Sequence, residues 1–210
     1  MTRKMVEDRQ KSSANKRYHI LEVARKIFAR HGLAKTTLDD IAMAVGMKKA
    51  SLYYYFENKE EIFGEVITQE SHEFLKVLKN SVSKEKDYVK KILKYAEVRL
   101  DYFRHMMNLH DLSIHVILEM KPVFEKLYTN FRNKEIELIS EIIDEAVKQG
   151  RFKPCKASKV ASAILTISDA LKFNEFCNAT MRLASEVDYS KVEKDTDYIL
   201  KLIINGLVKT

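Results

Sequence analysis

The stretch that decides the fold runs from Thr37 to Phe56 and reads TLDDIAMAVGMKKASLYYYF. Its first half predicts a short amphipathic helix, because apolar side chains recur there at helical spacing. These apolar positions are Leu38, Ile41, Ala42 and Val45. Thr37 precedes the helix with Asp40 three residues on, which is a variant of the capping box. Gly46 is expected to end the helix after about two turns.

A second short helix is expected over residues 49–55. Its inner face carries Leu52 and Phe56, which are four residues apart and would anchor it to the first helix. Its outer face carries side chains with hydrogen-bonding groups, namely Lys49, Ser51, Tyr53 and Tyr54. Two short helices joined by a tight glycine turn are typical of a helix-turn-helix, whose second helix enters a DNA major groove about 12 Å wide. A small helical bundle with exposed aromatic residues is the alternative at this point.

The chain on either side of this motif also indicates helices. Residues 1–15 show no periodicity and are expected to form a flexible basic arm. Apolar residues then recur at helical spacing from Ile20 to Phe28, and Gly32 supplies a C-terminal stop. Asn58, with Glu61 three residues later, marks the start of a longer helix. The helices expected beyond the motif cover 58–80, 86–107, 111–120, 122–149, 157–184 and 190–209.

The composition favours a helical protein with a basic front end. The 210 residues include only five Gly and two Pro, too few to punctuate a many-stranded β fold. Residues 1–62 hold 13 Lys and Arg against 8 Asp and Glu, whereas the remaining residues hold 24 against 22. A partner with many negative charges would explain this excess. A basic solubilising surface would explain it equally well.

Other features bear on the compartment. The N-terminus is charged with no apolar stretch behind it, which is unlike a secretory signal. No run of about 18 apolar residues is present, so we expect no membrane partner. Cys155 and Cys177 lack metal-type spacing and are most simply reduced thiols. The expected compartment is the cytoplasm.

Four blocks between Ile20 and Phe63 carry a family resemblance. They read ARKIFARHG, TT-x-DDIA-x-x-VG, SLYYYF and NKEEIF at a fixed spacing. Together they resemble the DNA-binding domain of the TetR family of bacterial regulators. The resemblance implies an all-helical homodimer, usually a repressor that a small ligand releases from its operator. We therefore expect an all-α fold, with an N-terminal three-helix DNA-binding domain in 1–62 and a larger helical ligand-binding and dimerisation domain in 63–210.

The resemblance also implies roles for single residues. Lys49, Ser51, Tyr53 and Tyr54 would lie closest to base edges, while Thr37, Tyr55 and Lys59 would contact phosphates of double-stranded DNA. The family usually has Ser or Thr where Lys48 stands. Lysine cannot accept the N–H groups that open a helix, so we interpret Lys48 as a further phosphate contact. Ala50 and Tyr54 replace the commoner Gly and His, which is expected to alter the operator sequence.

The second domain carries candidates for an effector pocket. Flexible Met beside aromatic residues suits an adaptable cavity, although plain core packing explains any one of them at least as well. The guest of such a cavity would be an apolar or aromatic small molecule. The candidate lining residues are Arg99, Tyr102, Phe103, Met106, His115, Met120, Tyr128, Phe131, Asp169 and Phe173.

The final two helices are expected to build a two-fold dimer. Each carries an apolar stripe, and two such helices from each subunit would form a four-helix bundle. The alternative is that the stripes pack only onto their own subunit. The candidate interface residues are Ile164, Ile167, Leu171, Ile199, Ile203 and Leu207.

Two other classes of protein fit the sequence less well than a regulator does. An enzyme is disfavoured because the sequence has no glycine-rich phosphate loop, no GxSxG elbow and no HExxH motif, and we expect no cofactor. His105, His110 and His115 recur every five residues, a spacing that spreads them over three faces of a helix, so we expect no metal site. A helical protein–protein adaptor would not need the basic second helix.

Overall fold

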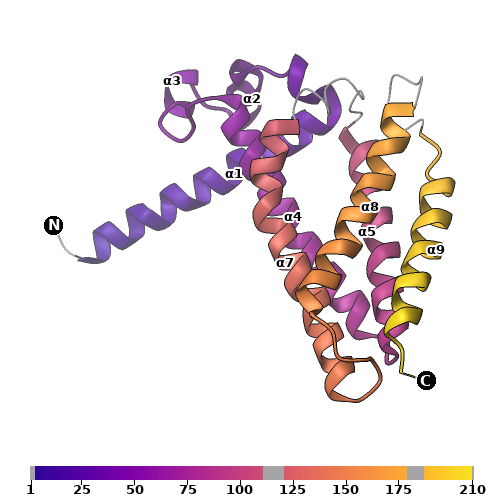
Figure 1. Cartoon of the computed structure of the whole chain (residues 1–210). Coiled ribbons are helices and arrows are strands. Elements are labelled where there is room, and N and C mark those ends of the chain that lie inside the picture. Colours follow the sequence, from indigo (N-terminus) through magenta and orange to yellow (C-terminus); the bar gives the residue numbers. More distant parts are fainter. Residues whose placement is uncertain (1–2, 111–120, 179–186, 210) are drawn as a thin grey trace. The chain divides into compact units, whose positions relative to one another are not determined.

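The computed structural model describes residues 3–110, 121–178 and 187–209, and it describes side chains within 11–105, 129–175 and 187–209. The described residues form helices joined by turns, so the predicted all-α fold class is confirmed (Figure 1). The helices are α1 (Arg3–Lys35), α2 (Leu38–Val45), α3 (Lys49–Leu52), α4 (Lys59–Ser83), α5 (Tyr88–His110), α7 (Lys121–Lys148), α8 (Ala157–Asn178) and α9 (Ser190–Leu207).

The chain divides into two compact units: the first covers residues 1–70 and the end of α5 from Leu109, and the second begins at Ser71 and includes the rest of α5. In the first unit α2 packs against both α1 and α3. Phe28 of α1 and Phe63 of α4 meet edge to face, with ring centroids 5.2 Å apart. The apolar core of this unit includes Ile20, Leu21, Ala24, Phe28, Ile41, Ala42, Leu52, Phe56, Ile62 and Phe63.

Both ends of α2 are capped as predicted. The Thr37 hydroxyl accepts from the Asp40 N–H at 3.2 Å, and the Asp40 carboxylate accepts from the Thr37 N–H at 2.8 Å. At the other end Gly46 has a left-handed backbone (φ 75°, ψ 33°), which glycine adopts without a steric penalty. The N–H groups of Gly46 and Met47 donate to the carbonyls of Met43 and Ala42, which is the Schellman pattern.

The N-terminal arm is a correction to the sequence analysis. Helix α1 begins at Arg3, so residues expected to form a flexible arm are helical. The segment lacks apolar periodicity because it has no buried face, and side chains such as Lys11 and Lys16 are exposed. Lys, Arg, Glu and Gln are good helix formers even without a buried face. The backbone leaves helical geometry at Gly32 (φ 73°, ψ 162°), where a stop was predicted.

Helix α3 is shorter than expected. It ends at Leu52 rather than Tyr55, and residues 53–55 form a turn. The Tyr55 and Phe56 N–H groups still donate to the Leu52 carbonyl, at 2.9 and 3.1 Å. The turn therefore keeps Leu52 and Phe56 together on the buried side, as the four-residue spacing predicted.

The second unit is built from the rest of α4, α5, α7, α8 and α9. Helix α8 packs along both α7 and α9 (Figure 1). An isolated antiparallel bridge between Phe152 and Val208 ties the α7–α8 connection to the end of the described chain. Among the described helices, none combines the length and apolar character needed to cross a membrane. The largest buried cluster includes Phe74, Leu78, Ile92, Tyr95, Ile139, Ile143, Ala161, Ile164, Leu165, Leu200 and Ile204.

The remaining helix predictions agree with the structure to within three residues at the ends that it describes. The helices expected over 58–80, 86–107 and 122–149 are α4, α5 and α7. Those expected over 157–184 and 190–209 are α8 and α9, although 179–184 lie outside the described residues. The helix expected over 111–120 also lies outside them.

Candidate functional sites

Helix α3 and the turn after it expose one continuous polar face. The side chains of Tyr53 and Tyr54 are 51% and 79% exposed, while Leu52 between this face and the core is fully buried. Tyr54 also meets the Tyr55 ring edge to face, with centroids 5.1 Å apart. The exposed residues of this face, which we call the α3 face, are Lys48, Lys49, Ser51, Tyr53 and Tyr54.

Lys49 has a partner within the same unit. Its ammonium donates to the Asp39 carboxylate of α2 at 2.7 Å. This hydrogen bond raises the pKa of Lys49 above its usual value, so the side chain is charged at neutral pH. Both side chains are largely exposed, and exposed pairs of this kind contribute little to stability. Lys49 is therefore available to exchange Asp39 for another anion.

The candidate phosphate contacts differ in their exposure and in their hydrogen bonds. Lys48 is the N-cap residue of α3 and its side chain makes no capping hydrogen bond, as predicted for a lysine. Thr37 is exposed, and its hydroxyl donates to the Asp40 carboxylate at 2.7 Å. This bond lowers the pKa of Asp40. Tyr55 is only partly exposed.

Lys59 has a structural role that the sequence did not indicate. Its ammonium donates to the carbonyls of Leu33 and Thr36, both at 2.9 Å, and to that of Ala34 at 3.4 Å. Three protons thus reach three carbonyls at the end of α1 and just before α2. A phosphate contact by Lys59 would compete with these bonds, so we assign the side chain first to joining α1 to the start of α4.

Arg17 is a functional candidate that the sequence analysis missed. Its guanidinium lies 4.0 Å from the centroid of the Phe56 ring and donates to the carbonyl of Tyr55. It also pairs with Glu65 of α4, with an Nε–Oε2 distance of 3.1 Å, and lies 3.5 Å from Glu61. Arg17 therefore holds the turn after α3 against α1 and α4. Its partners are up to 48 residues away, a separation at which the sequence gives no pairing signal.

Several candidate effector contacts are packing residues. Tyr102 stacks on Phe74 with centroids 3.8 Å apart, and Phe131 lies 5.8 Å from the same ring. Phe103 packs edge to face on Tyr189. The structure thus packs these partly buried aromatic side chains against the core, and their role in lining an effector pocket stays a prediction. Phe173 is 42% exposed. The side chains of Met106, His115, Met120 and Tyr128 lie outside the described residues.

Arg99 and Asp169 belong to a buried charge network. Arg99 donates to Glu135 with an Nε–Oε1 distance of 2.7 Å and pairs with Asp169 at 2.9 Å. The Tyr95 hydroxyl donates to Glu135 at 2.6 Å. Asp169 also accepts from Arg132 at 2.8 Å and pairs with Lys172 at 2.9 Å. We call Arg99, Arg132, Lys172, Glu135 and Asp169 the charge network.

The network perturbs the proton affinities of its members. Burial opposes ionisation of Asp169, but Arg99 and Lys172 hold its pKa well below the usual range. Burial, together with the neighbouring Arg99, lowers the pKa of Lys172 to about 8. Perturbed groups of this kind are frequent in functional sites, although structural ion pairs produce them too.

The candidate dimer residues divide into two groups. Ile164 is fully buried in the core of its own unit and cannot face a second copy, which corrects that prediction. The buried positions of α9 are Val192, Thr196, Leu200 and Ile204. The apolar side chains exposed on α9 are Tyr198 at 65% and Leu202 at 56%. The other candidates, all partly exposed, are Ile167, Leu171, Ile199, Ile203 and Leu207.

Comparisons with known proteins place these sites in a family. The profile of the tetR family of bacterial regulatory proteins matches residues 20–66, which include α2, α3 and the start of α4. The HTH-type transcriptional regulator YhgD of Bacillus subtilis is 25% identical over 166 residues, covering 77% of this chain and 85% of that relative. The biofilm operon icaADBC negative regulator IcaR of Staphylococcus epidermidis is 52% identical over 44 residues, 21% of this chain and 24% of IcaR.

A solved structure extends the likeness beyond the helix-turn-helix. The transcriptional regulator from Cytophaga hutchinsonii ATCC 33406 is 30% identical and has a TM-score of 0.76, with the match covering 90% of this chain and 97% of that one. The likeness therefore includes both units, and the matched helix-turn-helix carries the exposed α3 face. This chain belongs to the TetR family of bacterial transcriptional regulators, which bind DNA through an N-terminal helix-turn-helix.

Proposed function

We propose that this protein is a homodimeric repressor that binds an inverted-repeat operator and releases it when a small molecule occupies the second unit. The observation that carries the proposal is the α3 face, with exposed hydrogen-bonding side chains on one side of α3 and buried Leu52 and Phe56 on the other. A short helix of this kind presents its polar side to base edges while its apolar side fixes its position.

The base contacts and phosphate contacts would come from different parts of this unit. Lys49 would donate to guanine O6 and N7, and Ser51, Tyr53 and Tyr54 would lie against neighbouring bases. Lys48, Thr37 and Tyr55 would contact phosphates and set the register without reading sequence. Lys59 would reach a phosphate only after releasing a carbonyl at the end of α1.

Repression is supported by the names of relatives. IcaR of S. epidermidis is a negative transcriptional regulator, and its likeness to this chain lies over 44 residues at 52% identity. A protein at an operator represses when it blocks the access of polymerase, which needs no further catalytic group. We therefore assign repression as the sign of regulation.

A dimer would supply the second recognition helix. One α3 contacts too few base pairs for useful specificity, and a two-fold axis places two such helices roughly 34–36 Å apart in successive major grooves. The exposed Tyr198 and Leu202 of α9, with the partly exposed Ile199 and Ile203, offer an apolar surface for this contact. Ile167 and Leu171 of α8 would extend it.

Ligand release would act through α4. This helix begins with Lys59 in the first unit and continues past Glu70 into the second. A ligand that favours one position of α4 over another would shift the population of DNA-binding molecules, with a coupling of about 1–3 kcal/mol. DNA must then weaken ligand binding by the same factor.

The test is a selection of genomic fragments by the purified full chain, followed by mobility-shift titrations on the selected sequence. We expect an inverted repeat, binding that falls steeply with salt, and a Lys49→Ala variant weakened by about 1–3 kcal/mol on that sequence. Lys79→Ala is the matched control, because Lys79 is an exposed lysine of the second unit. Equal affinities of both variants for the operator would refute the assignment of the α3 face.

A further inference from the structure

We propose that one end of the second unit binds the phosphate backbone of a second DNA duplex without reading its sequence. This end comprises the α4–α5 turn, the α7–α8 connection and the end of α9, and we call residues 84–91, 144–159 and 205–209 the basic tip. The inference goes beyond the proposed function, which assigns DNA binding to the α3 face alone, and rests on it only for the first duplex. A protein with both surfaces would hold two DNA segments together.

The three segments of the basic tip meet in the fold. Phe152 of the α7–α8 connection forms the antiparallel bridge with Val208, and the Lys209 N–H donates to the Arg151 carbonyl at 3.0 Å. The Tyr88 ring at the start of α5 lies edge to face with that of Phe152, with centroids 6.4 Å apart. Figure 1 shows the α7–α8 connection and the end of α9 at the same end of the second unit. Segments far apart in the sequence therefore share one surface.

Positive charge is concentrated at the basic tip. The tip holds ten Lys and Arg against four Asp and Glu, whereas the rest of residues 63–210 holds 14 against 18. Within it, residues 146–159 include five basic residues and no acidic one. A nearly neutral part of the chain is thus divided into a basic end and an acidic remainder. The basic residues of the tip are Lys84, Lys86, Lys90, Lys91, Lys148, Arg151, Lys153, Lys156, Lys159 and Lys209.

These cations are not compensated by neighbouring carboxylates. Within the side chains that the structure describes, none of the ten lies within ion-pair distance of an acidic group. Two acidic residues of the tip serve other groups, since Asp87 accepts from the Lys90 N–H and Glu145 from the Gln149 side-chain amide, both at 2.9 Å. Nine of the ten basic residues are exposed, and Lys91 is partly exposed.

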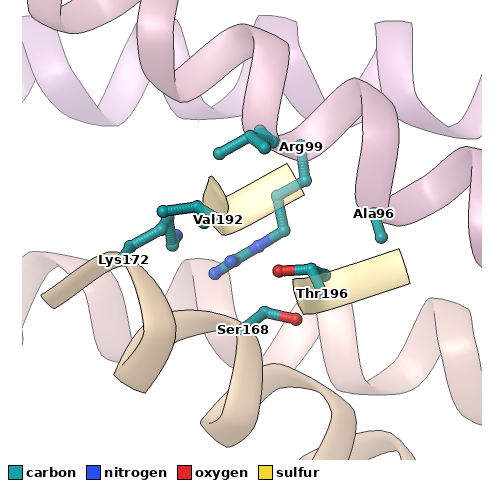
Figure 2. Close-up of a pocket in the computed structure, with 7 residues that line it drawn as sticks. Ala96, Arg99, Ser168, Lys172, Val192 and Thr196 are labelled. Atoms are coloured by element: carbon teal, nitrogen blue, oxygen red, sulfur yellow. The ribbon is translucent and has the colours of Figure 1, made fainter. Parts of the chain in front are cut away.

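The charge network shows the opposite arrangement. Figure 2 shows Arg99 and Lys172 on the lining of a small pocket, together with Ser168 and Thr196. Both cations lie 2.9 Å from carboxylate oxygen of Asp169. Their charges are compensated inside the unit, whereas those of the basic tip are left to solvent ions or to a partner.

The side chains of the tip favour a nucleic acid over an acidic protein or a membrane. Nine of the ten basic residues are Lys, which is depleted at protein–protein interfaces. Within the tip as described, no large apolar side chain is exposed for insertion into lipid, because Phe152 is buried and Tyr88, Val89 and Val208 pack against the core. Lysine ammonium groups, hydroxyls such as that of the exposed Ser158, and helix N-termini are the groups that contact phosphates.

The number of phosphates contacted determines the salt dependence. Each contact contributes about 0.9 to the slope of the logarithm of affinity against the logarithm of salt concentration. If four of the ten cations contact phosphates, the slope is about 3.6, and affinity falls about 100-fold between 50 and 200 mM salt. Contacts to phosphates carry no sequence information, so unrelated duplexes should bind equally.

The experiment uses the full chain bound to its operator. An operator duplex on beads is saturated with protein and washed, and retention of a fluorescent duplex without the operator is titrated between about 50 and 200 mM salt. We expect retention at low salt that does not depend on the sequence of the second duplex. No retention at the lowest salt concentration would show that the basic tip only solubilises the protein, and would overturn the proposal.

Two variants of equal charge separate the tip from a general effect of net charge. Lys153 is kept in both, because its ammonium donates to the Gly206 carbonyl at 3.3 Å. The tip variant combines Lys148→Gln, Arg151→Gln, Lys156→Gln and Lys159→Gln. The control changes four exposed lysines elsewhere in the second unit and combines Lys76→Gln, Lys79→Gln, Lys191→Gln and Lys194→Gln.

The tip variant should bind the second duplex about 10-fold or more weakly than wild type, with a salt slope lower by about 3 to 4, while its operator affinity is unchanged. The control should match wild type in all three measurements. Equal losses in both variants, or no loss in a tip variant that is folded by circular dichroism, would refute the site. A third variant, Lys84→Gln with Lys86→Gln and Lys90→Gln, alters a separate segment and should weaken retention too.

Two further measurements separate this proposal from its rivals. Flotation with phosphatidylserine vesicles tests a membrane partner, and vesicle binding that the tip variant loses, without retention of a second duplex, would overturn the proposal. If the wild type binds no operator, the proposed function is wrong, and direct titration of wild type, tip variant and control with unselected duplex then tests the tip alone. Operator binding without retention of a second duplex refutes the tip and leaves the proposed function intact.

Discussion

Replacing Lys172 by Met should stabilise the protein at neutral pH, although it removes an ion pair. The pKa of Lys172 falls from its ordinary value of 10.5 to about 8 because burial and Arg99 disfavour its charge. Each pKa unit corresponds to about 1.4 kcal/mol, so the charged lysine costs about 3 kcal/mol at pH 7. The contact with the Phe103 ring returns about 1 kcal/mol. Asp169 keeps Arg99 and Arg132 as partners in the variant, so we expect a net gain of about 2 kcal/mol.

The sign of the pH dependence follows from the direction of the shift. Between about pH 8 and 10.5 the unfolded chain holds the Lys172 proton more tightly than the folded chain does, so wild-type stability should rise relative to the variant. The advantage of Lys172→Met is therefore complete below about pH 8 and vanishes as the pH approaches 10.5. Lys191→Met, an exposed control, should leave the free energy of unfolding unchanged at every pH.

Urea unfolding of the two variants and the wild type, followed by circular dichroism at pH 7, 8, 9 and 10, measures these differences. The comparison between variants at each pH cancels the titration of other groups. A Lys172→Met protein that is less stable than wild type at pH 7, with a difference independent of pH, would show that Lys172 stabilises the fold. The argument that the charge network holds a costly cation would then be wrong.

Three further predictions concern the DNA-binding unit and the dimer. Lys59→Met should lower the free energy of unfolding by about 1–3 kcal/mol, because partly buried carbonyls at the end of α1 lose a charged donor. An unchanged Tm in thermal unfolding would mean that these bonds do not stabilise the fold. Asp39→Asn should raise operator affinity in mobility shifts, since it frees Lys49 and removes a negative charge from a surface that meets phosphates. Weaker binding would mean that Asp39 holds Lys49 in the position that contacts DNA. Leu202→Asp should yield a folded monomer by light scattering. Val77→Asp, the control at a matched exposure of 57%, should remain dimeric. The same oligomeric state in both variants would exclude this face of α9 from the dimer contact.

Local signals account for what the sequence predicted well. The ends of α2 depend on Thr37, Asp40 and Gly46, which lie within ten residues of one another and act through backbone groups of the same helix. The inner face of α3 follows from the spacing of Leu52 and Phe56 alone. Such features need no knowledge of the tertiary fold, because the interacting groups are neighbours in the chain.

Features that depend on exposure or on the third dimension were predicted less well. Helix α1 starts early because good helix formers need no buried stripe, and periodicity detects only buried stripes. In α9 the sequence assigned Ile199, Ile203 and Leu207 to a dimer contact, and the structure leaves these side chains partly exposed. The periodicity did not indicate that the side buried in the same subunit runs through Thr196 and Ile204. A polar Thr on the buried side breaks the apolar pattern, and Thr196 lines a small pocket together with Arg99 and Lys172.

The contacts of Lys59 and Arg17 show why the start of α4 is the point at which a ligand could control the α3 face. Lys59 joins the first residue of α4 to carbonyls at the end of α1, and two residues farther along the helix Glu61 begins the acidic pair that holds Arg17. Arg17 in turn holds the Tyr55 carbonyl in the turn that follows α3. A displacement of the α4 start relative to α1 must therefore break charge-assisted hydrogen bonds on both sides of the recognition helix. A charge-assisted hydrogen bond to a partly buried carbonyl is worth about 1.5–3 kcal/mol, which is as large as a typical allosteric coupling. An effector that acts at this point would need to alter only a few of these bonds, and the capping bonds of α2 are not among them.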